Sequence, residues 1–297
     1  MTTILPRPLG LLILTVLSMS LAACSQDSEY DLVIANGRVI DPETQLDAIR
    51  HLGIRDGSIS QISQQPLRGN KTIDASGLVV APGFIDIHSH TPTLLGQQVN
   101  LLDGITTQLE LEAGSFPVSF YGEHFRDGAQ INYGSSVGHW AVRTKVIEGV
   151  DMPYIFAGDK ILTMAGPAWM QAATAAQIEQ MRLLLNQGLD SGGLGIGVLL
   201  DYMTEAVSEA ELSMLFEVAS EREVPLFVHV RRGYTGDPAG LVEVIDLALE
   251  TGAPLFVCHI THNAMGGIGD WLAMIDEANH AGANHAGANI TTETLSY

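Results

Sequence analysis

From Gly83 onward, short apolar runs alternate with segments that carry helix start signals. Strands are expected at six of these runs: Phe84–His88, Ile105–Glu112, Ile131–Val137, Leu194–Leu199, Leu226–Val230 and Leu255–His259. Capping boxes at Thr174/Gln177 and Ser208/Glu211 predict helices over Ala175–Asn186 and Glu209–Arg222. Strands that alternate with helices form a parallel sheet, and no Gly-rich dinucleotide motif links a strand to a helix. The pattern therefore predicts an α/β fold with a barrel of parallel strands.

The stretch before Gly83 has the pattern of a small β structure. In Asp31–Ile40 we expect two short strands around an Asn36-Gly37 turn, and in His51–Ile62 two more around Asp56-Gly57. We therefore expect residues 24–81 to form the N-terminal part of a small β domain and residues 82–297 to form an incomplete barrel.

The first 23 residues resemble a targeting signal. Arg7 is the only charge before Asp27, and the apolar run Leu9–Ala23 is shorter than the roughly 20 residues of a membrane span. Leu21-Ala22-Ala23-Cys24 resembles the bacterial lipoprotein box, which implies lipidation of Cys24 after removal of residues 1–23. The resemblance also implies that an Asp after the cysteine would favour retention in the inner membrane; since this chain has Ser25 there, an outer-membrane lipoprotein on the periplasmic face is expected. A simple signal peptide or an uncleaved anchor remains the alternative.

Charge and hydropathy exclude two classes of protein. With 46% hydrophobic residues the chain is not intrinsically disordered. Lys plus Arg number 14 and Asp plus Glu number 34, which gives a net charge of -20, so a phosphate-binding nucleic-acid surface is not expected. Membrane contact is expected only through a lipid anchor. With Cys24 lipidated, Cys258 has no disulfide partner; it lies in an apolar strand and is expected to be buried, with a nucleophilic role as the alternative.

Four histidines occur at three predicted strand ends. His88 and His90 stand two residues apart and so share one strand face, while His229 and His259 end two later strands. Since the C-terminal strand ends of a parallel barrel meet at one mouth, these imidazoles are expected to converge. Neutral imidazole suits zinc and other borderline divalent ions. The histidines therefore predict a metal site.

The strand Ile105–Glu112 supplies a fifth predicted ligand. Gln108, Glu110 and Glu112 alternate with two leucines, which are expected to face the helices and so turn the carboxylates into the barrel. Buried carboxylates need a partner or a metal. Glu112 is nearest the strand end and is the predicted ligand, with Glu110 as the alternative or as the partner of a ligand histidine. An edge strand with solvated carboxylates is the other possibility.

These features together resemble the amidohydrolase superfamily. The resemblance rests on Asp31–Ile40, Ile54–Ile62, Ala81–His90, His229 and His259, and the D-aminoacylase branch (N-acyl-D-amino-acid deacylases) is matched in order at Gly104–Thr107, Val137–His139 with Arg143, Gly193–Gly195 and His229–Arg231. It runs from about Tyr30 to Tyr297. It implies a (β/α)8 TIM-type barrel with a small β-sandwich, and hydrolysis of non-peptide C–N amide bonds with one or two zinc ions, or another divalent metal.

Departures from that family bear on the site. Where D-aminoacylases have a cysteine ligand, this chain has Ala113, next to Glu112, and Leu194–Met203 lacks the lysine that other members carboxylate. Asn289–Thr294 resembles the seventh strand, so the eighth strand and the family's catalytic Asp are expected beyond Tyr297. We therefore expect an N-terminal fragment, inactive by itself, whose catalytic residue is unknown. The repeated His-Ala-Gly-Ala-Asn at 280–289 follows a helix, so its histidines are not expected to bind metal.

The implied substrate is an N-acyl-D-amino acid, a small molecule with a carboxylate. Arg231, two residues after His229 on the same face, is predicted to bind that carboxylate, and His139 to orient substrate or oxyanion. A structural ion pair is the alternative for Arg231, and a structural histidine for His139. The alternative functions are a cyclic amidase of the dihydroorotase or hydantoinase type, and a non-catalytic lipoprotein on a decayed hydrolase scaffold.

Overall fold

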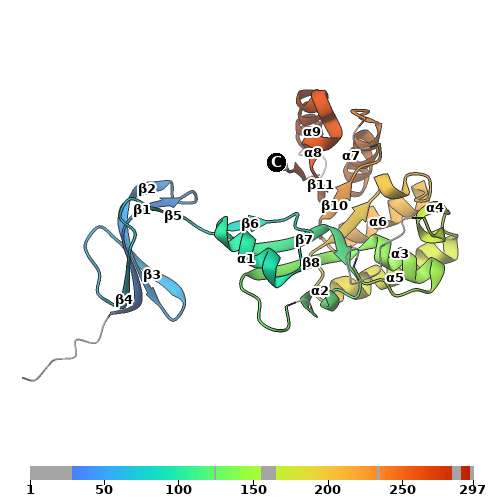
Figure 1. Cartoon of the computed structure of the whole chain (residues 1–297). Helices are drawn as coiled ribbons and strands as arrows, with labels where there is room; N and C mark the ends of the chain where they lie inside the picture. Colours follow the sequence, from blue (N-terminus) through green and yellow to red (C-terminus); the bar gives the residue numbers. More distant parts are fainter. Residues whose placement is uncertain (1–28, 124, 155–164, 233–234, 283–288, 295–297) are drawn as a thin grey trace, which may run out of the picture. The chain divides into compact units, whose positions relative to one another are not determined.

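The computed structural model describes residues 29–123, 125–154, 165–232, 235–282 and 289–294. The chain divides between Pro82 and Gly83 into two compact units, which are described separately (Figure 1). In the described part of the chain, no helix combines the length and the apolar character that a membrane span requires. The signal peptide and Cys24 predicted from the sequence lie outside the described residues.

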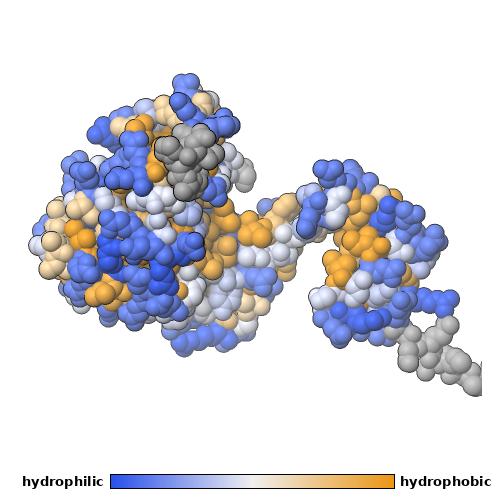
Figure 2. Space-filling model, turned by 180° about the vertical axis from the view of Figure 1, so that it is seen from behind, coloured by the Kyte–Doolittle hydropathy of each residue, from blue (hydrophilic) through white to orange (hydrophobic). Residues whose placement is uncertain are grey.

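The N-terminal unit is a five-stranded sheet. Its strands are β1 (Tyr30–Asp41), β2 (Leu46–Arg55), β3 (Ser58–Ser63), β4 (Gly69–Asp74) and β5 (Val79–Val80). They are ordered β3-β2-β1-β4, and β5 also pairs with β1. Apolar residues such as Val39, Leu52 and Ile62 line a cavity of about 360 Å³, and Figure 2 shows hydrophobic side chains gathered on the visible face of this unit.

The two Gly-containing turn signals have different outcomes. Asp56 (φ 51°) and Gly57 (φ 74°) connect the antiparallel β2 and β3, so this hairpin is confirmed. The hairpin at Asn36-Gly37 is wrong: β1 runs through it as one strand, with an irregularity between Ile34 and Gly37. A Cβ at Gly37 would lie 2.5 Å from the Val80 side chain, so the glycine allows β5 to approach β1.

The C-terminal unit alternates strands and helices. In chain order its elements are β6 (Phe84–Asp86), α1 (Leu94–Leu102), β7 (Ile105–Ser115), α2 (Ser119–Glu123), β8 (Asn132–Gly138), α3 (His139–Glu148), α4 (Pro167–Met170), α5 (Ala175–Asp190), β9 (Ile196–Leu199), η1 (Asp201–Met203), α6 (Glu209–Glu221), β10 (Leu226–His229), α7 (Ala239–Thr251), β11 (Leu255–Val257), α8 (Ile260–Ala264), η2 (Met265–Gly267), α9 (Ile268–Gly282) and β12 (Ile290–Thr292). Each predicted strand is present, with ends that shift by one to three residues.

The sheet of this unit has barrel winding. Its seven strands are ordered β12-β11-β10-β9-β8-β7-β6, and every neighbouring pair is parallel. Each strand lies beside the one before it, without the reversal of direction that marks a doubly wound sheet. Successive helices pack on one another, α3 on α5, α5 on α6 and α6 on α7. The predicted α/β barrel architecture is therefore confirmed for the described strands.

Two hydrophobic clusters cover the two faces of this sheet. The larger joins strands to helices and includes Leu226 and Val228 of β10 with Leu215 and Phe216 of α6. The smaller contains Leu111, Phe227 and Cys258. Since Phe227 alternates with Leu226 and Val228 along β10, the smaller cluster lies on the face away from the helices. His229, two residues after Phe227, extends from that same inner face.

The two predicted capping boxes differ in the structure. At α5 the box is complete: the Thr174 side chain accepts from the Gln177 N–H, and the Gln177 side chain accepts from the Thr174 N–H. At α6, Ser208 accepts from the Glu211 N–H, at 3.3 Å. The Glu211 side chain is instead buried in an ion pair with Arg143. Only the Ser208 half of that predicted box is therefore observed.

Candidate metal centre

The four strand-end histidines meet at one edge of the parallel sheet. His88 and His90 follow β6, His229 is the last residue of β10, and His259 follows β11. His259 has φ 35°, a left-handed conformation that turns the chain at the strand end. The ring centroids of His229 and His259 are 4.4 Å apart, and those of His88 and His90 are 4.8 Å apart.

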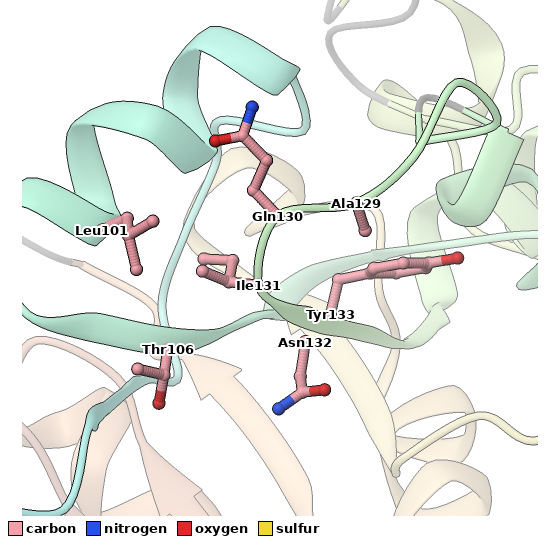
Figure 3. A pocket seen from close by; sticks show the side chains of 7 residues that line it. All are labelled: Leu101, Thr106, Ala129, Gln130, Ile131, Asn132 and Tyr133. Atoms are coloured by element: carbon pink, nitrogen blue, oxygen red, sulfur yellow. The ribbon is translucent and has the colours of Figure 1, made fainter. Parts of the chain in front are cut away.

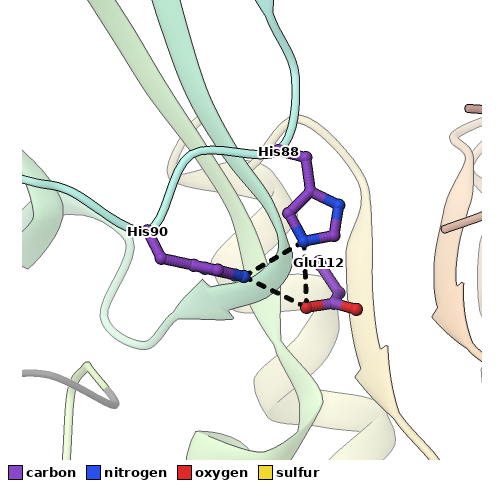
Figure 4. Close-up of side chains that lie close together, drawn as sticks. All are labelled: His88, His90 and Glu112. Carbon is purple, nitrogen blue, oxygen red and sulfur yellow. Dashed lines mark hydrogen bonds and ion pairs between the residues drawn. The ribbon is translucent and has the colours of Figure 1, made fainter. Parts of the chain in front are cut away.

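The carboxylate of Glu112 lies between two pairs of histidines. Its Oε2 is 3.2 Å from Nε2 of both His88 and His90, and those two nitrogens are 3.1 Å apart (Figure 4). Its Oε1 is 3.0 Å from Nδ1 of His229 and 2.6 Å from Nε2 of His259, again with 3.1 Å between the nitrogens. Each oxygen therefore completes a separate triad of potential metal ligands.

Glu112 reaches this position by a different route from the one predicted. The leucines of β7 do not face the helices: Leu111 packs on the inner face with Phe227, while Gln108 bonds to Asn100 of α1 and Tyr121 of α2. Pairing between β7 and β8 is irregular between Glu110 and Ser115. This bulge breaks the two-residue alternation and directs Glu112 toward the histidines. The leucines therefore face the opposite side from the one predicted, although the Glu112 carboxylate does lie among the histidines.

Glu110 lies behind His90. Its Oε2 is 2.8 Å from His90 Nδ1 and accepts from the Tyr154 hydroxyl at 2.5 Å, and its Oε1 accepts from the Ala113 N–H. Glu110 is fully buried, so the edge-strand alternative with solvated carboxylates is wrong. Burial, the charge on Glu110 and the hydrogen bond to it raise the pKa of Tyr154, which therefore remains a hydrogen-bond donor.

Glu293 is a site residue that the sequence analysis missed. It directly follows β12, and its Oε1 pairs with His88 Nδ1. Its position at a strand end is the same signal that identified the histidines, but a carboxylate at a strand end does not by itself indicate a metal site. Asp201, the first residue of η1 and two residues beyond β9, has Oδ2 3.8 Å from His229 Nε2 and was missed as well.

Carboxylates change the proton affinity of the first histidine pair. Burial alone would lower the pKa of His88, but hydrogen bonds to Glu112 and Glu293 raise it to about 9. For His90, Glu110 and Glu112 likewise outweigh burial and raise the pKa to about 10. Burial would raise the pKa of Glu112, yet its four histidine partners hold it well below its usual range. A divalent cation that binds to these histidines would have to displace their protons.

The donor set fits a zinc-like ion. Zinc bonds of about 2.0–2.2 Å in tetrahedral geometry place neighbouring ligand atoms about 3.3–3.6 Å apart. The triad of His88, His90 and Glu112 Oε2 has separations of 3.1–3.2 Å, within a few tenths of an ångström of that value. The second triad is tighter, at 2.6–3.1 Å. The ligand roles of His88, His90, Glu112, His229 and His259 remain predictions that this geometry accommodates.

Each of the two predicted substrate-binding residues contacts a glutamate. His139 is fully buried, with Nε2 2.8 Å from Glu211. Arg231 pairs with Glu243 at 2.8 Å and donates to the carbonyls of Thr204 and Val207. Within the described residues, neither one bonds to the histidine cluster. The geometry therefore agrees with the structural alternatives and gives substrate binding by either residue no support.

The Cys258 thiol and the pocket of Figure 3 do not add reactive groups to the candidate metal centre. Burial raises the pKa of the Cys258 thiol well above its usual value, which disfavours a nucleophilic thiolate. A pocket of about 540 Å³ is lined by Leu101, Thr106 and residues 129–133 (Figure 3). It lies where β7 and β8 begin, whereas the histidines lie where strands end, and its lining contains no ionisable group except Tyr133.

A model of the amidohydrolase family matches residues 71–289 of the chain. The D-aminoacylase of Alcaligenes xylosoxydans xylosoxydans is 25% identical over 275 residues, covering 82% of this chain and 52% of that protein. The N-acyl-D-glutamate deacylase of the same organism is 27% identical over 294 residues, covering 86% and 55%. The chain thus spans about half the length of these two curated relatives.

One solved structure and one shorter sequence match are also similar to this chain. The N-acyl-D-glutamate deacylase of Bordetella bronchiseptica, solved with zinc and a phosphonate mimic of the tetrahedral intermediate, has a TM-score of 0.67 and 26% identity. The match covers 90% of this chain and 59% of that one. A dihydroorotase of Streptococcus pneumoniae serotype 4 is 50% identical, but over 60 residues, which are 20% of this chain and 14% of that protein.

Proposed function

This chain belongs to the amidohydrolase family, and from that membership we propose that it serves metal-dependent hydrolysis of a non-peptide C–N amide bond. The observation that carries the proposal is the Glu112 carboxylate between two histidine pairs, one triad at each oxygen. We propose an N-acyl-D-amino acid as the substrate. The relatives named D-aminoacylase and N-acyl-D-glutamate deacylase, matched over more than four-fifths of this chain, support that choice.

We propose one or two zinc ions, held by His88, His90, Glu112, His229 and His259. A bound divalent ion supplies Lewis acidity, which polarises the amide carbonyl and makes water a stronger acid. The protein's part is to hold the ligands in place. Glu110 accepts from His90 Nδ1, so a bound cation would displace the proton of Nε2 and use that nitrogen's lone pair. Tyr154 and the Ala113 N–H fix the Glu110 carboxylate in turn.

Two alternative functions make different predictions. A cyclic amidase would open a ring such as dihydroorotate, and the dihydroorotase match favours it, although that match covers one-fifth of the chain. The absence of a lysine in Leu194–Met203 counts against the carboxylated-lysine form of that site. A non-catalytic lipoprotein on the same scaffold would bind metal without releasing amine.

The test is a substrate panel on the purified protein. We expect release of free amine from N-acetyl-D-amino acids, little from the L-enantiomers, loss of activity with a chelator and recovery with zinc. Ring opening of dihydroorotate or hydantoin without release from the D-substrates would favour the cyclic amidase. Metal binding without any turnover would favour the non-catalytic alternative.

A further inference from the structure

Glu293 connects the two ends of the parallel sheet. In the strand order β12-β11-β10-β9-β8-β7-β6, β6 and β12 are the two end strands. His88 follows β6 and Glu293 follows β12, yet His88 Nδ1 and Glu293 Oε1 are paired. The sheet is therefore curved enough for side chains that follow its first and last strands to pair across its C-terminal edge.

The Glu293 carboxylate is held in place by the neighbouring strand. The Ile260 N–H donates to the Glu293 carbonyl at 3.1 Å, and the His259 N–H donates to Oε1 at 3.4 Å. The Thr292 hydroxyl donates to the Val257 carbonyl at 2.7 Å. Only 12% of the Glu293 side chain is exposed, compared with 8% for His88. The His88–Glu293 contact is thus buried, and backbone hydrogen bonds to the residues after β11 hold Glu293 in place.

The contact determines which nitrogen of His88 faces the proposed metal site. With Nδ1 occupied by Glu293, Nε2 lies 3.2 Å from Glu112 Oε2 and 3.1 Å from His90 Nε2. A carboxylate that accepts from one ring nitrogen selects the tautomer whose other nitrogen has a free lone pair. Glu110 makes the equivalent contact to His90 Nδ1. Each histidine of the pair is therefore supported by its own carboxylate, from a different strand.

We propose that Glu293 is a positioning residue that fixes the ring and tautomer of His88 for metal binding. The same contact makes metal binding depend on the docking of β12 at the strand-end edge. This inference rests on the proposed metal centre. Its consequence is that metal binding and the ordering of β12 strengthen each other, since both require the His88–Glu293 contact.

A competing role for Glu293 is direct ligation. His88, Cys258 and Glu293 each have a ligand atom within 4.8 Å of the other two, so they could form a separate metal site. That site would need the Cys258 thiolate, and burial strongly raises the pKa of this thiol. If Glu293 is a direct ligand in that site, removal of the Cys258 sulfur should weaken metal binding. If Glu293 only positions His88, it should not.

The experiment measures zinc affinity and the cobalt(II) absorption spectrum of the full-length protein. Glu293→Ala removes the acceptor, Glu293→Gln keeps an uncharged acceptor of equal size, and Cys258→Ser removes the thiol. Glu277→Gln, on the exposed face of α9, is the matched control for charge. Affinity should fall about 10–100-fold in Glu293→Ala and less in Glu293→Gln, as for other residues behind metal ligands. Cys258→Ser and Glu277→Gln should match the unaltered protein.

The cobalt spectrum and the imidazole NMR separate positioning from general stability. We expect an altered ligand-field spectrum in Glu293→Ala, and loss of the His88 Nδ1–H resonance that the contact protects. If Glu293→Ala does not fold, Glu293→Gln alone must still show weaker binding. Unchanged affinity in both variants, or a thiolate–cobalt band that Cys258→Ser removes, would overturn the inference. If the unaltered protein does not bind metal, both the proposed function and the role of Glu293 are overturned.

Discussion

A single carboxylate, Glu112, organises the candidate centre. The sequence identified the four histidines because each lies at the end of an apolar strand, and strand ends converge in a parallel barrel. It missed Glu293, which occupies the same kind of position, because carboxylates are common on surfaces and residue type alone does not mark them. The role of Tyr154 could not be predicted from the sequence. Tyr154 lies outside any helix or strand, and it is 44 residues from Glu110, which accepts its hydrogen bond.

The raised pKa values give the metal-free and metal-bound proteins opposite pH responses. His88 and His90 have pKa values of about 9 and 10 in the folded chain, against 6.5 for an ordinary histidine. Their stabilising protonation is therefore complete below about pH 6.5 and is lost as pH rises to about 10. The melting temperature of metal-free protein should fall over this range, while zinc affinity should rise because ligands must lose protons.

The check is a series of thermal melts between pH 6.5 and 10 with a chelator, compared with zinc titrations at the same pH values. His90→Gln is the control, and its metal-free melting temperature should decline less steeply. A metal-free protein whose melting temperature rises with pH across this range would contradict the assignment.

For single helices and strands, sequence patterns predicted the structure correctly where residues close in sequence make the backbone hydrogen bonds. The Thr174 cap of α5 and the Asp56-Gly57 hairpin are examples. Two such predictions were wrong because a residue distant in sequence makes the contact. At Gly37 the strand β5 packs against β1, so no hairpin forms there. At α6 the Glu211 carboxylate pairs with Arg143 and does not complete the capping box. The bulge of β7 is the most consequential case, because it sets the position of Glu112 and has no period-two signature.

Gly197 of β9 provides a test of that strand arrangement. A Cβ there would lie 2.4 Å from the Glu112 carbonyl and 2.7 Å from that of Leu111. Gly197→Ala should therefore shift β7, lower the free energy of unfolding by about 1–3 kcal/mol and weaken zinc binding. The measurements are urea denaturation and zinc titration.

Gly269→Ala, in α9, is the matched control because a Cβ there has open space around it. A Gly-to-Ala change inside a helix is expected to stabilise by up to about 1 kcal/mol and should leave zinc affinity unchanged. Equal behaviour of the two variants would show that the contact between β9 and β7 does not position Glu112.

At the scale of the whole molecule, the alternation of strands and helices was enough to predict the barrel winding, because sequential parallel strands have few ways to pack. The sequence could not supply the curvature that brings Glu293 to His88, since that depends on the twist of all seven strands. The chain spans 52% of the D-aminoacylase and 55% of the N-acyl-D-glutamate deacylase to which it is similar, so its activity is a proposal that the substrate panel tests.

We propose that the protein is exported and anchored by a lipid on Cys24. Metabolic labelling with a fatty acid in a bacterial host should label the unaltered protein and Cys258→Ala, but not Cys24→Ala. Cys258 is the matched control because it is the only other cysteine of the sequence. Label retained by Cys24→Ala, or absent from the unaltered protein, would contradict the anchor.

We propose that Glu112 joins two histidine pairs into one metal centre. The most direct measurement is the divalent metal content of purified full-length protein, compared with that of Glu112→Gln and Glu110→Gln. We predict about one to two zinc ions per chain, since two triads share one carboxylate. Glu112→Gln should lose more metal than Glu110→Gln, because Glu112 contacts all four histidines whereas Glu110 supports His90 from behind. No stoichiometric metal in the unaltered protein, or a larger loss in Glu110→Gln, would contradict the claim.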